Sequence, residues 1–209
     1  WKKEILLHQF ENAVAGCIHS TTIDVDSDGD LDWAGSLPHN HPIWLENPGS
    51  SDFAKGPWVK RIIDPEITGI HCLITSDIDN DGKQDLVINN FLPDEGIADS
   101  MAWFSVPENV HAAEKWHRYI FADGDARGGS HYMSAADIDG DGTPDLGNAR
   151  NYLGAGPLDP GIRIFLVNPG QTDAINYSFE SEEYATVLGA HLDIDDDGRD
   201  EFFATTVGE

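Results

Sequence analysis

Groups of aspartates recur along the chain at a spacing that suits a divalent cation. Each group places Asp at positions 1, 3 and 5 of a nine-residue stretch, Gly at position 6 and an acid at position 9, and the stretch occurs four times. Carboxylate oxygens at alternating positions can converge on a hard ion such as Ca²⁺ when glycine lets the backbone turn sharply, and position 7 offers its carbonyl. The sequence therefore predicts up to four structural calcium ions. The predicted ligands are Asp24, Asp26, Asp28, Asp30, Asp32, Asp77, Asp79, Asp81, Lys83, Asp85, Asp137, Asp139, Asp141, Thr143, Asp145, Asp193, Asp195, Asp197, Arg199 and Glu201.

Neither an EF-hand nor a plain acidic turn fits these loops as well. An EF-hand needs a bidentate Glu at position 12 and flanking helices. Position 12 here is Gly35, Ile88, Asn148 or Ala204, and the residues around Ile88 have the composition of a strand. Solvated acidic turns are also rich in Asp and Gly, but turn chemistry alone does not demand the same constrained positions in every copy.

Histidines form a second set of residues that could do chemistry. His19, His71 and His131 precede the first aspartate of the first three loops by five, six and six residues. Together they could bind a transition metal, or one of them could act as a general base. Because a repeat protein reuses the same packing solution, they could equally be structural histidines that hydrogen-bond a neighbouring repeat. The residues that could steady an oxyanion or enolate beside them are Arg127, Tyr132 and Arg150.

The segments around the loops predict the elements that hold them. The first aspartates are 53, 60 and 56 residues apart, a period that suits a four-stranded sheet. Apolar and β-branched residues precede and follow each loop, as at 72–75 and 86–89, which predicts a hairpin with the ion at its tip. A third strand ends in a turn with Pro four residues after an aromatic, and a fourth begins at Trp58 or Trp116. This order predicts an all-β protein, a β-propeller of about four antiparallel four-stranded blades.

Residues 1–209 are predicted to form one propeller segment, which the repeats divide into blades. We expect a fourth strand of a blade at 1–10, three repeats at 11–63, 64–121 and 122–180, and an incomplete blade at 181–209. Two expectations follow. The chain is a segment of a larger ring, or a partner chain supplies the missing strand by β-augmentation and produces a homo-oligomer or fibre.

Ligand binding is expected at the mouth of the propeller opposite the calcium loops, where the connections between second and third strands are long. The candidate ligand-binding residues are His39, Asn40, His41, Trp44, Arg127, Tyr132, Asn151 and Tyr152. Trp58, Trp103 and Trp116 recur at equivalent positions and are expected in the core between blades.

Charge and cysteine content narrow the partners and the location. A net charge of −26 without a basic cluster argues against nucleic acid, and no run of about 18 uncharged apolar residues suggests membrane insertion. The surplus acid fits metal ligands, saline surroundings or a cationic partner. Sites of four carboxylates would fill at the roughly millimolar calcium outside cells, so we expect an extracellular or periplasmic protein. Cys17 and Cys72 are either bridged or free buried thiols.

The loop sequences resemble those of FG-GAP or VCBS repeats. The strand that begins with Trp58, the Gly-Ile-His segment that ends at His71 and the turn at residues 44–49 resemble the propeller domain of aldos-2-ulose dehydratase-like proteins. The first resemblance implies a calcium-binding propeller. The second implies a carbohydrate-active eliminase in which a channel histidine abstracts a proton α to a carbonyl or carboxylate.

Two classes of function therefore remain open. One is a secreted binding module, or the unit of an assembly, in which calcium stiffens hairpins and a loop face recognises carbohydrate or protein. The other is a dehydratase or lyase that uses the channel histidines. An active channel requires a closed ring, and this favours the binding module.

Overall fold

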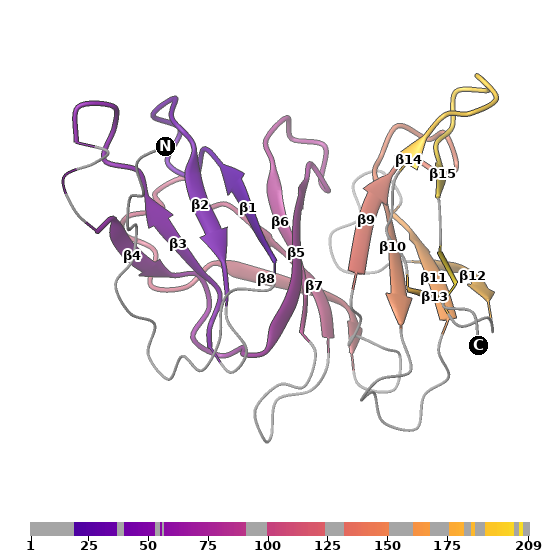
Figure 1. The fold of residues 1–209 in the computed structure, drawn as a ribbon, viewed down its shortest axis with the longest axis horizontal. Helices are drawn as coiled ribbons and strands as arrows, with labels where there is room; N and C mark the ends of the chain where they lie inside the picture. The colour runs from indigo at the N-terminus through magenta and orange to yellow at the C-terminus, as the bar shows by residue number, and fades with distance from the viewer. Residues whose placement is uncertain are drawn as a thin grey trace.

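The computed structural model describes residues 19–36, 40–52, 55, 57–90, 100–123, 132–150, 161–167, 176–181, 185–186, 191–202 and 205–206. Within these ranges every regular element is a β-strand, so none of them contains a helix that could cross a membrane. The strands form successive small antiparallel sheets that stand side by side (Figure 1). The all-β prediction is confirmed, and the arrangement is that of propeller blades.

Three sheets have four strands each, in the order in which the chain makes them. Blade 1 consists of β1 (Ser20–Ile23), β2 (Asp32–Gly35), β3 (Ile43–Glu46) and β4 (Val59–Ile62). Blade 2 consists of β5 (Ile70–Ser76), β6 (Asp85–Asn90), β7 (Ser100–Ser105) and β8 (His117–Asp123). Blade 3 consists of β9 (Tyr132–Ala136), β10 (Asp145–Arg150), β11 (Gly161–Leu166) and β12 (Asn176–Ser181).

Past blade 3 the chain forms a hairpin in two parts. The outer part pairs β13 (Ala185–Thr186) with β16 (Thr205–Thr206), and the part nearer the loop pairs β14 (His191–Leu192) with β15 (Glu201–Phe202). This hairpin carries the fourth acidic loop. The strand predicted at 1–10 lies outside the described residues, as does Cys17.

Burial on both faces of β6 explains the run of three apolar residues at 86–88. All six residues of β6 are buried. Leu86 and Ile88 pack into a core shared with blade 1, whereas Val87 packs into a core shared with Met133 and Leu146 of blade 3. Because successive side chains of a strand point to opposite faces, β6 needs apolar residues at successive positions to join both neighbours.

Trp103 and Trp116 lie in cores between blades, as predicted, whereas Trp58 is buried in a smaller cluster made of blade 1 residues, among them Ile43 and Leu45. Trp58, Trp103 and Trp116 are 7%, 1% and 1% exposed. Trp116 packs in the core between blades 1 and 2, and its backbone N–H donates to the Ile63 carbonyl of blade 1 at 2.9 Å. The interface between these blades is thus closed by both apolar packing and a backbone hydrogen bond.

Candidate functional site

The acidic loops lie at the tips of the hairpins formed by the first two strands of each blade, at one end of the molecule (the top of Figure 1). In each loop, the first aspartate organises the turn by accepting two backbone N–H groups. Asp77 Oδ1 accepts from Asp81 N at 3.0 Å, and Asp77 Oδ2 accepts from Gly82 N at 2.9 Å. Asp24 and Asp193 accept from the same two positions, 5 and 6, of their own loops, and Asp137 accepts from positions 4 and 6.

The aspartate at position 5 fixes the second half of the loop. Its Oδ1 accepts the N–H of position 7 in all four copies, at 2.8–3.0 Å. Glycine at position 6 has φ between 88° and 95° in all four, which is the left-handed region that glycine enters without strain. The carboxylates at positions 1 and 5 therefore hold the loop in a tight turn by accepting its backbone N–H groups.

The acid at position 9 ties the loop to the sheet. Asp32 Oδ2 accepts from Val25 N at 3.0 Å, and its Oδ1 accepts from Asn47 N, just past β3, at 2.7 Å. Asp145 makes the same pair of bonds to Ile138 and Val167. Burial raises the pKa of Asp32 to about 6, of Asp85 to about 7 and of Asp145 to about 6.

Three carboxylates converge in every loop, with one oxygen of each within 4.8 Å of the others. In the first three loops they are positions 1, 3 and 9, and in the fourth they are positions 1, 3 and 5. In loop 1, Asp26 Oδ1 and Asp30 Oδ1 are buried and have no hydrogen-bond partner among the described residues. Orphaned carboxylate oxygens beside other carboxylates are costly unless a cation lies among them. The donor set, oxygen alone, fits Ca²⁺.

Neighbouring loops touch one another. The Asn80 side-chain amide of loop 2 donates to the Gly142 carbonyl of loop 3 at 3.1 Å. Asp200 N, in the second half of loop 4, donates to the Asp137 carbonyl at 3.2 Å. A loop held in a fixed conformation can therefore stabilise the conformation of the neighbouring loop.

The innermost strands bring two of the predicted histidines together with Tyr132 at the other end of the blades. The His19 ring lies 5.9 Å from the His71 ring and 5.2 Å from the Tyr132 ring. These residues stand just before β1, in β5 and in β9, so three blades contribute to one cluster. Burial lowers the pKa of His19, which favours its neutral form at pH 7. His131 and Arg127 lie outside the described residues, and the Arg150 side chain is not described.

Beside this cluster, the Cys72 thiol is free and lies 3.8 Å from His19 Nδ1. Burial raises the pKa of Cys72 to about 11. The thiol is therefore protonated at pH 7 and is a poor metal ligand or nucleophile there.

The described residues of the loop between β2 and β3 make contacts within the fold. His41 Nδ1 lies 3.0 Å from the Ile67 carbonyl, and Ser36 Oγ donates to the Asn40 carbonyl at 3.0 Å. Trp44 is 0% exposed, so it packs in the core and offers no surface for ligand stacking. His39, Asn151 and Tyr152 lie outside the described residues.

An open pocket of about 530 Å³ lies between β5 and β9 at the acidic-loop end. Its walls include Thr75, Ser76 and Ser134, and three carboxylates line it, Asp77, Asp137 and Asp200. Sequence reasoning placed ligand binding at the opposite mouth, where much of the chain lies outside the described residues. The pocket between β5 and β9 lies next to the acidic loops, and the predicted site at the opposite mouth stays a prediction.

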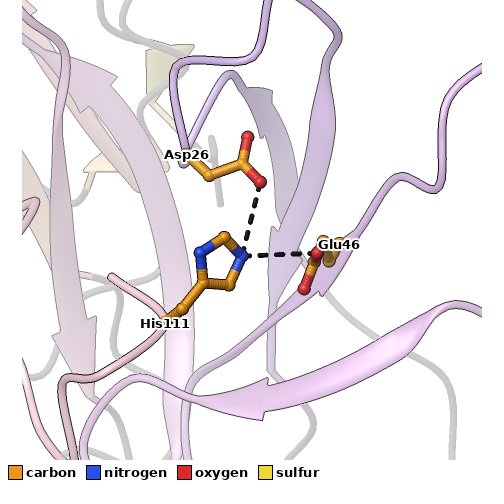
Figure 2. A group of neighbouring side chains, drawn as sticks. All are labelled: Asp26, Glu46 and His111. Carbon is orange, nitrogen blue, oxygen red and sulfur yellow. Dashed lines mark ion pairs between the residues drawn. The ribbon is translucent and has the colours of Figure 1, made fainter. Parts of the chain in front are cut away.

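Sequence analysis missed a cluster of Asp26, Glu46 and His111. His111 Nε2 lies 3.5 Å from Asp26 Oδ2 and 3.3 Å from Glu46 Oε1 (Figure 2). Glu46 is the last residue of β3, and His111 belongs to the connection between β7 and β8 of blade 2. No repeat spacing relates the three, so only the packing of blade 1 against blade 2 reveals them.

Comparison with known proteins yields one partial match. Residues 15–88 match a family model described as an FG-GAP-like repeat. The match covers the first two acidic loops and β1 through much of β6. A search of curated proteins found no relative of this chain. The predicted FG-GAP resemblance is thus supported, whereas the likeness to aldos-2-ulose dehydratases finds no support.

Proposed function

We infer that this chain is a calcium-dependent β-propeller scaffold, acting outside the cytoplasm, that presents a ligand-binding face. The observation that carries the proposal is the convergence of three carboxylates within 4.8 Å in each of four loops. The match to an FG-GAP-like repeat supports the scaffold part of the proposal.

The chemistry of the loops favours calcium over other roles for the acids. Every converging oxygen belongs to a carboxylate, and hard oxygen ligands suit Ca²⁺. Without a cation, the position-9 acids would carry buried charge close to other acids of the same loop, in keeping with the raised pKa of Asp85. A bound divalent ion neutralises this charge and holds the two strands of the hairpin together.

Calcium removal tests the proposal directly. We expect isothermal titration to show calcium binding and the melting temperature of the chain to fall substantially in excess EGTA, because an ion that binds only the folded state stabilises it by mass action. The double variant Asp77→Asn/Asp79→Asn should lose part of this response. Asp52→Asn, an exposed acid outside the loops, is the matched control and should keep it. An identical melting curve with and without EGTA would reject the proposal.

The ligand is carbohydrate or protein, in keeping with an acidic protein that nucleic acid would repel. The pocket between β5 and β9 is one candidate binding site for it, since Thr75, Ser76 and Ser134 line it together with Asp77, Asp137 and Asp200. Polar groups of this kind bind sugar hydroxyls well. Extracellular calcium would keep the walls of this pocket ordered.

A second candidate is elimination from an acidic sugar, which the cluster of His19, His71 and Tyr132 favours. A neutral His19 could accept a proton, and a phenol within the same cluster could donate to a developing oxyanion. Ultraviolet absorbance of an unsaturated product, measured with polyuronides as probe, tests it. Activity that disappears in His19→Asn but persists in His117→Asn would support it, and absence of activity in the unaltered chain would reject it.

A further inference from the structure

We propose that Asp26, Glu46 and His111 form a transition-metal site between blades 1 and 2, separate in chemistry from the calcium loops. One imidazole nitrogen and two carboxylate oxygens converge there, all within 4.8 Å of one another. Mixed nitrogen and oxygen ligands suit Zn²⁺ or Co²⁺, whereas Ca²⁺ prefers oxygen alone. The site would take a divalent ion of the zinc class.

The distances from the imidazole nitrogen to the two carboxylate oxygens match such an ion. Zinc bonds of about 2.0–2.2 Å at tetrahedral angles put ligand atoms roughly 3.3–3.6 Å apart. His111 Nε2 lies 3.3 Å from Glu46 Oε1 and 3.5 Å from Asp26 Oδ2. A single ring nitrogen carries at most one hydrogen and cannot aim it at both carboxylates, but a metal ion between them satisfies all three ligands (Figure 2).

The surrounding residues hold each ligand in place. Arg61 Nε and an Arg61 terminal nitrogen bind Glu46 Oε2 at 2.9 and 2.8 Å, which leaves Glu46 Oε1 for the ion. The Arg61 guanidinium rests 5.6 Å from the centre of the buried Trp44 ring. Such outer partners orient metal ligands and tune their affinity.

His111 is positioned by its turn. Its neighbour Val110 is 5% exposed and packs in the core shared by blades 1 and 2, while Ala112 N donates to the Asn109 carbonyl at 3.1 Å. The backbone at His111 is thus fixed from both sides. Its own side chain is 46% exposed, so solvent or an external ligand can reach the remaining coordination positions.

Asp26 belongs both to this cluster and to the carboxylate group of loop 1. Its Oδ2 faces His111, and its Oδ1 is buried without a hydrogen-bond partner among the described residues. The side chain is 11% exposed. A carboxylate with one oxygen available on each side can bridge two ions, so the new site would share a ligand with the first calcium loop.

Titration of the full chain with Zn²⁺ and Co²⁺ in saturating calcium tests the proposal. We expect one Zn²⁺ site by calorimetry and a visible Co²⁺ absorption spectrum that Zn²⁺ removes. His111→Gln should abolish both signals, and Arg61→Gln should weaken binding by about tenfold or more. The matched control His117→Gln changes an exposed histidine of the same blade and should bind as the unaltered chain does.

Two results would overturn the site. One is the absence of a Zn²⁺ isotherm in the calcium-loaded chain whose folding is verified by circular dichroism. The other is equal binding by His111→Gln and the unaltered chain, which would place the ion elsewhere. Calcium binding by loops 2 and 3 uses none of these residues, so its success or failure is measured separately.

Discussion

At the scale of single residues, the loops depend on two left-handed backbone positions, of which the sequence revealed one. The glycine repeated at position 6 indicates the first of these two positions. Position 4 also has positive φ, at 60° in Ser27, 60° in Asn80, 58° in Asp196 and 77° in Gly140. Short polar residues tolerate this conformation because they hydrogen-bond locally. Since four different residue types fill position 4, no repeated letter pointed to it.

Asp85 should control the pH response of the metal-free protein. Its folded pKa of about 7 lies above the unfolded value of about 3.9, so the folded state holds its proton longer. Its contribution to stability is full below about pH 4 and is lost as the pH rises through about 7. In EGTA, Asp85→Asn should therefore melt higher than the unaltered chain at pH 7 and at about the same temperature at pH 4.

Bound calcium should reverse the ranking of the melting temperatures, so that the unaltered chain melts higher than Asp85→Asn. An ion present at about 100 times its Kd contributes about 2.7 kcal/mol, which the variant forfeits in loop 2. The amide oxygen that Asp85→Asn supplies can still accept the Ile78 N–H, so the loop keeps its shape. Thermal melts at both pH values, with and without calcium, check this. The same ranking in all conditions would contradict a buried charge at Asp85.

At the scale of elements, the sequence predicted the strand order well and the contacts between blades poorly. Each strand carries its own signal, because the β6 residues 86–88 are apolar and the loop residues are acidic. Contacts such as His111 with Asp26 join segments 85 residues apart in repeats whose alignment does not relate them. Only the packing of one sheet on the next brings them together. The stretches between β6 and β7 and between β10 and β11 lie outside the described residues, so the ligand site predicted there stays a prediction.

A buried ion pair joins blades 1 and 2. Asp64, 0% exposed, follows β4, and Arg118 Nη1 of β8 lies 2.9 Å from its Oδ2. Arg118→Met should lower the free energy of unfolding by up to about 3 kcal/mol, because Asp64 Oδ2 loses its charged partner while Oδ1 keeps the Glu66 N–H at 2.8 Å and Lys115 Nζ at 3.8 Å. Asp64→Asn/Arg118→Met should recover much of this loss. Urea unfolding of the calcium-loaded protein measures both.

Lys55→Met is the control for these Arg118 variants. Lys55 pairs with Asp52 on the surface, where both side chains are well exposed. Its loss should cost less than about 1 kcal/mol. If Arg118→Met costs no more than this control, the interblade pair does not hold the blades together.

Contact between loops should make calcium binding cooperative. Asn80→Gly keeps the left-handed backbone of loop 2 but removes the amide that reaches Gly142 of loop 3. We expect a lower Hill coefficient for calcium in this variant. Ser27→Gly makes the same backbone change in loop 1 and should leave the coefficient unchanged. Equal coefficients in both variants would show that the loops fill independently.

At the scale of the whole molecule, the net charge of −26 makes the metal-free fold sensitive to salt. The acids of the four loops gather at one end of the hairpins, so their mutual repulsion is largest when calcium is absent (Figure 1). Raising NaCl from about 0.01 M to about 0.15 M shortens the screening length from about 30 Å to about 8 Å. The melting temperature in EGTA should therefore rise clearly with salt.

With calcium bound, the same salt increase should have a smaller effect, because each divalent ion would cancel two of the negative charges in its loop. Differential scanning calorimetry at matched salt concentrations compares the two states. Equal salt dependence in EGTA and in calcium would show that the loops contribute little to the repulsion.

The buried Cys72 has a practical consequence for watching the blades separate. Its side chain packs with Met133 and Leu146 of blade 3, and its pKa of about 11 keeps it unreactive while the two sheets stay together. Because Cys72 is 1% exposed and its sulfur also lies 3.8 Å from His19 Nδ1 of blade 1, a thiol reagent reaches it only when the packing around it opens. The rate at which this sulfur is labelled thus reports transient opening of the region where blade 2 packs against its neighbours.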